Sequence, residues 1–160
     1  MPIPLKTSLL FRGNALEVMR FYETVFPDFE EISVSRMPAG GPDEEGEVMA
    51  VNYKLLGMEF VAINADFPYV HDDAVSFIIT VQTQDEIDTY WNALLADGGE
   101  ESMCGWLKDR FGISWQVIPV QLPDLLGDPD PGRAGRAMQA MLQMRKIDLA
   151  AMQSAADSRP

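Results

Sequence analysis

The chain has 160 residues, a length that fits one domain with a substantial core. Its 25 acidic residues outnumber its 12 basic ones and give a formal net charge of -13. Such a charge repels nucleic-acid phosphates and anionic lipid surfaces, so we expect no nucleic acid and no membrane among its partners. A single cysteine cannot build a disulfide framework, and we expect neither a leader segment nor a membrane span, which would need an apolar run of roughly 18 residues. These features predict a soluble, cytoplasmic protein.

The first part of the chain predicts a strand, a helix and three more strands. Residues 5–11 alternate as a strand does, and Asn14 can cap the helix that follows. The helix is expected to bury one stripe, formed by Val18, Phe21, Tyr22 and Val25. The further strands are predicted at residues 29–37, 47–55 and 58–64. Between the first two of them, the proline-, glycine- and acid-rich residues 38–46 predict a solvated loop, with a binding lid as the alternative.

A connector at residues 66–73 leads to a second series of the same kind. It holds His71, Asp72 and Asp73, which we do not expect to share a metal ion because alternate side chains of an extended segment point apart. Strands are predicted at residues 74–81 and 100–105, on either side of a helix from about Gln84 to Ala96 that Thr83 can cap. The apolar stripe of this helix is expected at Ile87, Tyr90, Trp91, Leu94 and Leu95.

Residues 104–119 predict a hairpin with its turn at residues 109–112. Its second strand has one face of Ser114, Gln116 and Ile118 and another of Ile113, Trp115 and Val117.

The hairpin has an earlier counterpart in the chain. Residues 56–64 match residues 111–119 at a constant offset of 55, with Gly57 on Gly112. Further upstream, the strand around Ser8 matches that around Ser76 at an offset of 68. The difference of 13 residues predicts a longer connection in the first unit, at residues 38–46. One strand-helix-strand-strand-strand unit written twice is thus predicted, the alternative being chance similarity between short apolar strands.

The composition changes after Pro119. Residues 122–127 can form one helical turn, and a linker at residues 128–131 leads to a helix with Asp130 as its cap. The apolar stripe of that helix is expected at Ala134, Met138, Met141 and Leu142. Residues 147–156 continue or restart the pattern. We therefore expect a paired βαβββ domain at residues 1–120, with modules at 1–65 and 74–120. A helical extension at 121–160 is expected to pack on that domain or on a dimer partner.

Several motifs resemble one known family. They are Gly-Asn-Ala at residues 13–15, Ala-Val-Ser-Phe at 74–77, Cys-Gly-Trp-Leu-Lys-Asp at 104–109, Gly-Ile-Ser-Trp-Gln at 112–116 and Asp-Pro-Asp-Pro at 128–131. In these the chain resembles the PhnB-like branch of the glyoxalase, bleomycin-resistance and dioxygenase superfamily, also called vicinal oxygen chelate proteins. The resemblance implies an α+β fold of two tandem βαβββ modules whose curved mixed sheets surround a concave cup, commonly in a homodimer. Members of the branch often carry the label 3-demethylubiquinone-9 3-methyltransferase.

The resemblance also implies where a metal would be bound. In the superfamily's metalloenzymes, histidine and glutamate ligands project from the first and fourth strands of each module. Here those places correspond, within a residue, to Thr7, Val61, Ser76 and Gln116. Hydroxyl and amide groups alone bind a divalent ion weakly, so we expect no metal and no cofactor.

The cup is expected to have a mostly apolar lining with a few polar groups. The expected ligand-binding residues are Thr7, Leu9, Phe11, Glu59, Val61, Ser76, Ile78, Trp106, Ser114 and Gln116, and the same lining includes Ile63, Thr80 and Ile118. Glu59 is the candidate catalytic base, with a solvated or lysine-paired carboxylate as the alternative. Lys108, Asp109 and Arg110 are expected with Trp106 at the rim, or else as a turn held by an ion pair.

The sequence thus favours metal-free binding of a small organic molecule. The alternatives are a metal-dependent isomerase, lyase or dioxygenase-type enzyme, a methyltransferase as the family label implies, and a dimeric scaffold associating through its tail. The methyltransferase alternative lacks the glycine-rich loop after a first strand that S-adenosylmethionine enzymes of the commonest fold use.

Overall fold

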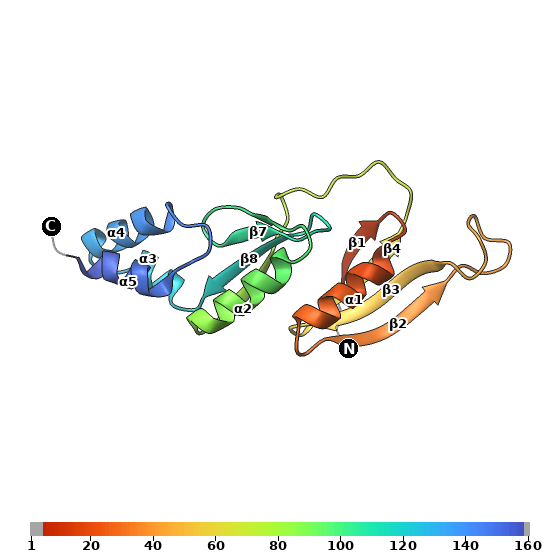
Figure 1. The fold of residues 1–160 in the computed structure, drawn as a ribbon, viewed down its shortest axis with the longest axis horizontal. Helices are drawn as coiled ribbons and strands as arrows, with labels where there is room; N and C mark the ends of the chain where they lie inside the picture. Colours follow the sequence, from red (N-terminus) through yellow and green to blue (C-terminus); the bar gives the residue numbers. More distant parts are fainter. Residues whose placement is uncertain (1–4, 159–160) are drawn as a thin grey trace. The chain divides into compact units, whose positions relative to one another are not determined.

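The computed structural model describes residues 5–158 and divides the chain into two compact units, Met1–Val70 and His71–Pro160. Residues 1–4, which were expected to lead without a signal into the first strand, lie outside the described part. Each unit contains one four-stranded mixed sheet and one long helix packed on it (Figure 1). No helix among residues 5–158 is long and apolar enough to cross a bilayer.

The first unit is a βαβββ module. Its elements are β1 (Thr7–Phe11), α1 (Ala15–Val25), β2 (Glu30–Arg36), β3 (Val48–Leu55) and β4 (Met58–Asn64). The strand order is β1-β4-β3-β2, with β1 parallel to β4 and the other pairs antiparallel. The connection from β2 to β3 occupies residues 37–47, where the longer loop was predicted.

The second unit repeats this topology. Its elements are β5 (Phe77–Val81), α2 (Gln84–Leu95), β6 (Glu100–Glu101), β7 (Trp106–Lys108) and β8 (Ser114–Pro119). The strand order is β5-β8-β7-β6, again with the first and last strands of the module parallel. Gly57 and Gly112, matched by the sequence repeat, both adopt left-handed backbone angles in their hairpin turns, with φ of 79° and 84°. The predicted pair of βαβββ modules is therefore confirmed.

The registers of β1 and β5, the first strands of the two modules, correct the offset predicted between these strands. Thr7 pairs with Phe60 in β4, and Phe77 pairs with Trp115 in β8. Since Phe60 and Trp115 are equivalent at the offset of 55, Thr7 is equivalent to Phe77, at an offset of 70. The predicted offset of 68, with Ser8 on Ser76, is wrong because both strands contain a short run of similar residues that can be aligned two positions apart.

The core of the first unit lies between α1 and one face of its sheet. The predicted stripe of Val18, Phe21, Tyr22 and Val25 is buried. Tyr22 packs near Tyr53 of β3, with ring centroids 6.1 Å apart, and Tyr53 stacks on Phe60 of β4 at 5.5 Å. Alternate residues of β3 and β4 therefore face α1, which fixes the two faces of this sheet.

In the second unit, α2 buries Ile87, Trp91 and Leu94 of its predicted stripe. Its start is capped as predicted. The Glu86 amide donates to the Thr83 hydroxyl at 3.2 Å, and the Thr83 amide donates to the Glu86 carboxylate at 3.1 Å. Donation from the backbone amides of Gln82 and Thr83 lowers the pKa of Glu86, so this reciprocal cap favours the ionised carboxylate.

The start of α1 is built differently from the prediction. The Asn14 side chain makes no capping hydrogen bond. The Asn64 side chain takes that role from the end of β4, because its oxygen accepts from the Ala15 amide at 2.9 Å. Its nitrogen donates to the Val48 carbonyl at 2.8 Å. The cap is thus a long-range contact, which local sequence could not indicate.

The strand predicted at residues 100–105 ends after Glu101. Cys104 and Gly105 both have positive φ, which turns the backbone out of the extended conformation. Their amides donate to the carbonyls of Met144 and Arg145, at 2.8 and 2.7 Å, instead of to a neighbouring strand. The residues after the tail's second helix therefore take the place of strand pairing here.

The tail contains α3 (Leu122–Leu126), α4 (Pro131–Met141) and α5 (Leu149–Asp157), so the pattern restarts after α4. Asp130 caps α4 as predicted. The predicted stripe of α4 is wrong in part: Ala134 and Met141 are half-buried, but Met138 and Leu142 are exposed, and the buried residue of the helix is Ala137. The tail also contacts α2, where the Gln84 side chain bonds to the Ile147 carbonyl and the Leu149 amide.

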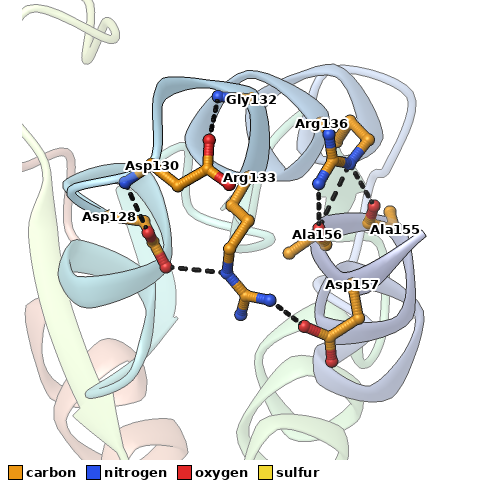
Figure 2. Close-up of polar contacts among 8 residues, drawn as sticks. All are labelled: Asp128, Asp130, Gly132, Arg133, Arg136, Ala155, Ala156 and Asp157. Atoms are coloured by element: carbon orange, nitrogen blue, oxygen red, sulfur yellow. Dashed lines mark hydrogen bonds and ion pairs between the residues drawn. The ribbon is translucent and has the colours of Figure 1, made fainter. Parts of the chain in front are cut away.

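Two arginines of α4 hold α5 in place (Figure 2). The Arg136 guanidinium donates to the carbonyls of Ala155 and Ala156 at the end of α5, and the Ala155 carbonyl also accepts from the Ser158 amide and hydroxyl. Arg133 bridges Asp128 and Asp157. This network ties the linker and both helices into one folded segment.

Candidate functional site

The face of the second sheet that points away from α2 carries half of the predicted ligand-binding residues. In register, Ile78 pairs with Gln116, Trp106 with Gln116, and Lys108 with Ser114, so their side chains share one face. Phe77, Leu107 and Trp115 lie on the opposite face with α2. We call the face formed by Ile78, Trp106, Lys108, Ser114 and Gln116 the second open face. The register places the predicted residues Ile78, Trp106, Ser114 and Gln116 on this face, and Ser76, which precedes β5, joins them through a hydrogen bond with Gln116.

The polar groups of the second open face are fixed by one another. The Gln116 amide nitrogen donates to the Ser76 hydroxyl at 2.8 Å. Both side chains are half-buried, while Ile78 beside them is 59% exposed. An apolar surface thus lies next to an oriented amide and hydroxyl, a combination typical of sites for small organic molecules.

A second polar group on this face joins Ser114, Asp73 and Lys108. The buried Ser114 hydroxyl donates to the Asp73 carboxylate at 2.7 Å, and the Lys108 ammonium lies 3.3 Å from the other oxygen of that carboxylate. The hydrogen bond from Ser114, followed by Lys108, lowers the pKa of Asp73. Asp73 is therefore a weak base, and the group suits binding of a polar substituent better than proton abstraction.

Asp109 has a structural place in the β7–β8 turn. Its carboxylate accepts hydrogen bonds from the Trp115 indole at 2.9 Å and from the amides of Phe111 and Ile113 at 2.9 and 3.1 Å. Asp109 is buried, and Arg110 pairs with the exposed Asp97 at 3.4 Å. Asp109 and Arg110 therefore stabilise the turn. This is the alternative that the sequence offered to a place at the rim of the cup.

The first sheet has a corresponding face directed away from α1. Glu59 pairs with Lys54 and Val61 with Asn52, which places all four side chains on this first open face. The Lys6 ammonium lies 3.0 Å from the Glu59 carboxylate, and both groups are partly exposed. The candidate base is therefore a lysine-paired carboxylate near the start of β4, which is the alternative to a catalytic role.

Strand β1 departs from the predicted lining. Thr7 and Leu9 pair with Phe60 and Ala62, so they lie on the face toward α1, and the Thr7 hydroxyl donates to the Met58 sulfur at 3.8 Å. Phe11 is on that same face and is buried. The prediction that these three residues share a face with Glu59 and Val61 is wrong. The strand alternates as expected, but its alternation alone does not tell which face is which.

The donors at the implied metal positions do not fit a metal ion. Thr7 lies on the opposite face from Val61, and Ser76 and Gln116 offer a hydroxyl and an amide that bond to each other. Among residues 5–158, no three His, Cys, Asp or Glu side chains gather as a metal site requires. Asp72 and Asp73 of the connector bond instead to the Ala74 amide and to Ser114.

Sequence reasoning missed two residues of the open faces. The sequence pattern placed Asp73 only beside His71 and Asp72, a group that is not expected to bind a metal ion. It gave Lys6 no role. The signal available for Lys6 was its position one residue before β1, where an alternating side chain falls on the face of Glu59. Asp73 had no such signal, because its contact with Ser114 depends on the path of the connector.

Comparison with known proteins agrees with this architecture. A family model described as 3-demethylubiquinone-9 3-methyltransferase matches residues 4–118. The structure of a PhnB protein from Bacillus cereus, which carries the same methyltransferase description, is 35% identical with a TM-score of 0.62 and covers 74% of this chain and all of its own. No curated protein is similar enough to count as a match.

Two more distant structures share the fold. Protein PA1353 from Pseudomonas aeruginosa is 22% identical, with a TM-score of 0.58 over 74% of this chain and 98% of its own. The fosfomycin resistance protein FosX from Listeria monocytogenes, complexed with Mn(II) and sulfate, is 13% identical, with a TM-score of 0.52 over 76% of this chain and 94% of its own. The family match ends at residue 118, so α3, α4 and α5 lie beyond it.

Proposed function

Because this chain belongs to the PhnB-like family described as 3-demethylubiquinone-9 3-methyltransferase, we propose that it binds a small organic molecule without a metal ion. The proposed binding surface is the second open face. The observation that carries the proposal is the Gln116–Ser76 hydrogen bond beside the exposed Ile78 and the half-buried Trp106.

The chemistry of this face favours a ligand with an apolar ring or chain and one polar substituent. Ile78 and the Trp106 indole offer apolar contact, and aromatic rings pack well on an indole. The amide of Gln116 and the hydroxyl of Ser76 can each both donate and accept a hydrogen bond. A neutral hydroxyl on the ligand therefore finds partners for its donor and its acceptor.

Fluorine NMR of protein labelled with fluorotryptophan tests this proposal, using p-cresol as the probe. The chain has three tryptophans, and Trp91 of α2 and Trp115 of β8 are both buried, so they serve as internal controls for Trp106. We expect p-cresol to shift the Trp106 signal saturably, equally well with and without a chelator. Gln116→Ala should weaken binding about fivefold, as loss of one hydrogen bond does. A shift that needs added metal, or equal shifts of all three signals, would contradict the proposal.

The family description itself names a second candidate, methyl transfer. Calorimetry with S-adenosylmethionine separates it from the binding function. Binding of S-adenosylmethionine in the micromolar range would favour the methyltransferase, whereas we expect no heat beyond dilution.

The proposal includes a cytoplasmic homodimer, as the family resemblance implies. Light scattering during size-exclusion chromatography should give about twice the chain mass of 17.8 kDa. Truncation after Gly127 then tests the tail as the dimer contact. An unchanged dimer would place the contact elsewhere.

A further inference from the structure

The first unit contains a pocket of about 480 Å³ whose lining includes none of the residues named above for either open face. It lies where β1 ends, α1 begins and the residue 37–47 connection returns to β3. Its walls combine the apolar side chains of Leu16, Met37 and Met49 with the charged residues Asp43, Glu47 and Asp66. A cavity of this size is in the range that holds a small organic ligand.

The pocket is held open by hydrogen bonds between its walls. The Asn64 side chain connects the Ala15 amide at the start of α1 with the Val48 carbonyl at the start of β3. The loop is closed at its base, where the Met37 amide donates to the Glu47 carbonyl at 2.7 Å and the Gly46 amide donates to the Met37 carbonyl at 3.0 Å. The walls are therefore largely preformed, which reduces the entropy cost of binding.

The charge of the pocket lining indicates whether a ligand should be cationic or anionic. The residues that line the pocket include three acids, Asp43, Glu47 and Asp66, and one base, Arg12. Arg12 already donates to the Phe67 carbonyl at 3.0 Å and lies over the Tyr69 ring at 5.4 Å, so part of its donor capacity is used within the unit. The lining has a net negative charge, and the whole chain is acidic as well. A cationic ligand is favoured and an anionic one is repelled.

The apolar part of the lining defines the rest of the ligand. Methionine side chains are flexible and polarizable, so Met37 and Met49 can adapt to an alkyl or aryl group. The loop is also confined to the first unit, because the equivalent connection between β6 and β7 spans only residues 102–105. The second unit therefore has no equivalent of the loop that forms one wall of this pocket.

We propose that this pocket is a binding site for a small organic cation that carries an apolar arm, such as an alkylamine. The carboxylates of Asp43, Glu47 and Asp66 attract its ammonium group, and Met37, Met49 and Leu16 contact its chain. The residue 37–47 connection then forms one wall of a binding site. This corresponds to the binding lid that the sequence offered as the alternative to a solvated loop.

Methionine-methyl NMR tests the site, with hexylamine as the probe and hexanoate and 1-hexanol as matched comparisons of the opposite and zero charge. We expect hexylamine to shift the methyl signals of Met37 and Met49 saturably while the exposed Met138 of the tail stays in place. Glu47→Gln and Asp66→Asn should each weaken binding about two- to fivefold, the range for a partly exposed charge pair. Raising the salt concentration should weaken binding further.

Glu45→Gln is the matched control, because Glu45 lies on the same loop outside the pocket lining. It should bind hexylamine as the native chain does. Equal binding of hexylamine and 1-hexanol, unaltered binding in Glu47→Gln and Asp66→Asn, or shifts spread over all methionines would overturn the proposal. The p-cresol response of Trp106 should be the same in Glu47→Gln, so failure here is distinguishable from failure of the proposed function.

Discussion

Asp109 organises the β7–β8 turn through its buried carboxylate. One oxygen accepts from the amides of Phe111 and Ile113, and the other accepts from the Trp115 indole. Because these donors are satisfied by a charged acceptor, each bond contributes more than a neutral one does. The motif that resembles the family at residues 104–109 therefore ends in a residue that shapes the fold.

Asp109→Asn should destabilise the protein by about 2 kcal/mol, because the new amide group places a donor against the Trp115 indole donor. Urea unfolding followed by circular dichroism measures the loss. Asp97→Asn is the control, since Asp97 is exposed and asparagine tolerates its positive φ, and its effect should stay within about 0.5 kcal/mol. Equal stability of the Asp109→Asn and Asp97→Asn variants would contradict the assigned role of Asp109.

Asp73 gives a pH-dependent prediction. Its pKa is lowered by the Ser114 hydroxyl and by Lys108. A lowered folded pKa adds stability above the unfolded value of about 3.9, and that stability is lost as the pH falls through the folded pKa. In Ser114→Ala the pKa of Asp73 should therefore rise toward its ordinary value, as carbon NMR of the carboxyl group can measure. An identical titration in both proteins would show that Ser114 does not hold the carboxylate.

At the scale of elements, the two helices of the modules begin in different ways. Thr83 and Glu86 form the local cap of α2, whereas α1 depends on Asn64, which is far from it in sequence. Local sequence patterns could therefore predict the cap of α2 but not the cap of α1. The same limit explains β1: alternation predicted the strand, but the register with β4 decides that Thr7 faces α1.

Asn64→Ala should cost about 1–3 kcal/mol, because the Ala15 amide and the Val48 carbonyl both lose their partner. Asn14→Ala, at the position that the sequence indicated, should change the free energy of unfolding by less than about 0.5 kcal/mol. Thermal unfolding of the two variants side by side is the measurement. If Asn14→Ala destabilised the protein more than Asn64→Ala, Asn14 and not Asn64 would be the residue that caps α1.

The link from α4 to α5 can be tested at Arg136. Arg136→Ala removes the donors to the Ala155 and Ala156 carbonyls, so the amides of α5 should exchange with solvent about fivefold faster or more. Amides of β8 should keep their native exchange rates. Arg20→Ala on the exposed side of α1 is the matched control, and it should leave α5 unchanged. Native exchange of α5 in Arg136→Ala would show that the helix is held by other contacts.

At the scale of the whole chain, the repeat was predictable because each module needs the same apolar alternation to cover its helix. The second open face followed from the period of β8, in which Gln116 and Ser114 alternate with Trp115 and Val117. The connector at Asp73, the tail contacts at Gln84 and the pocket below the loop were not predictable, because they depend on where separate segments meet.

The central claim is that the second open face binds its ligand without a metal ion. Elemental analysis of protein purified without a chelator tests it most directly. We expect far less than one divalent ion per chain, with no change in Glu59→Ala or Gln116→Ala. Stoichiometric metal in the native protein that is lost in either variant would contradict the claim.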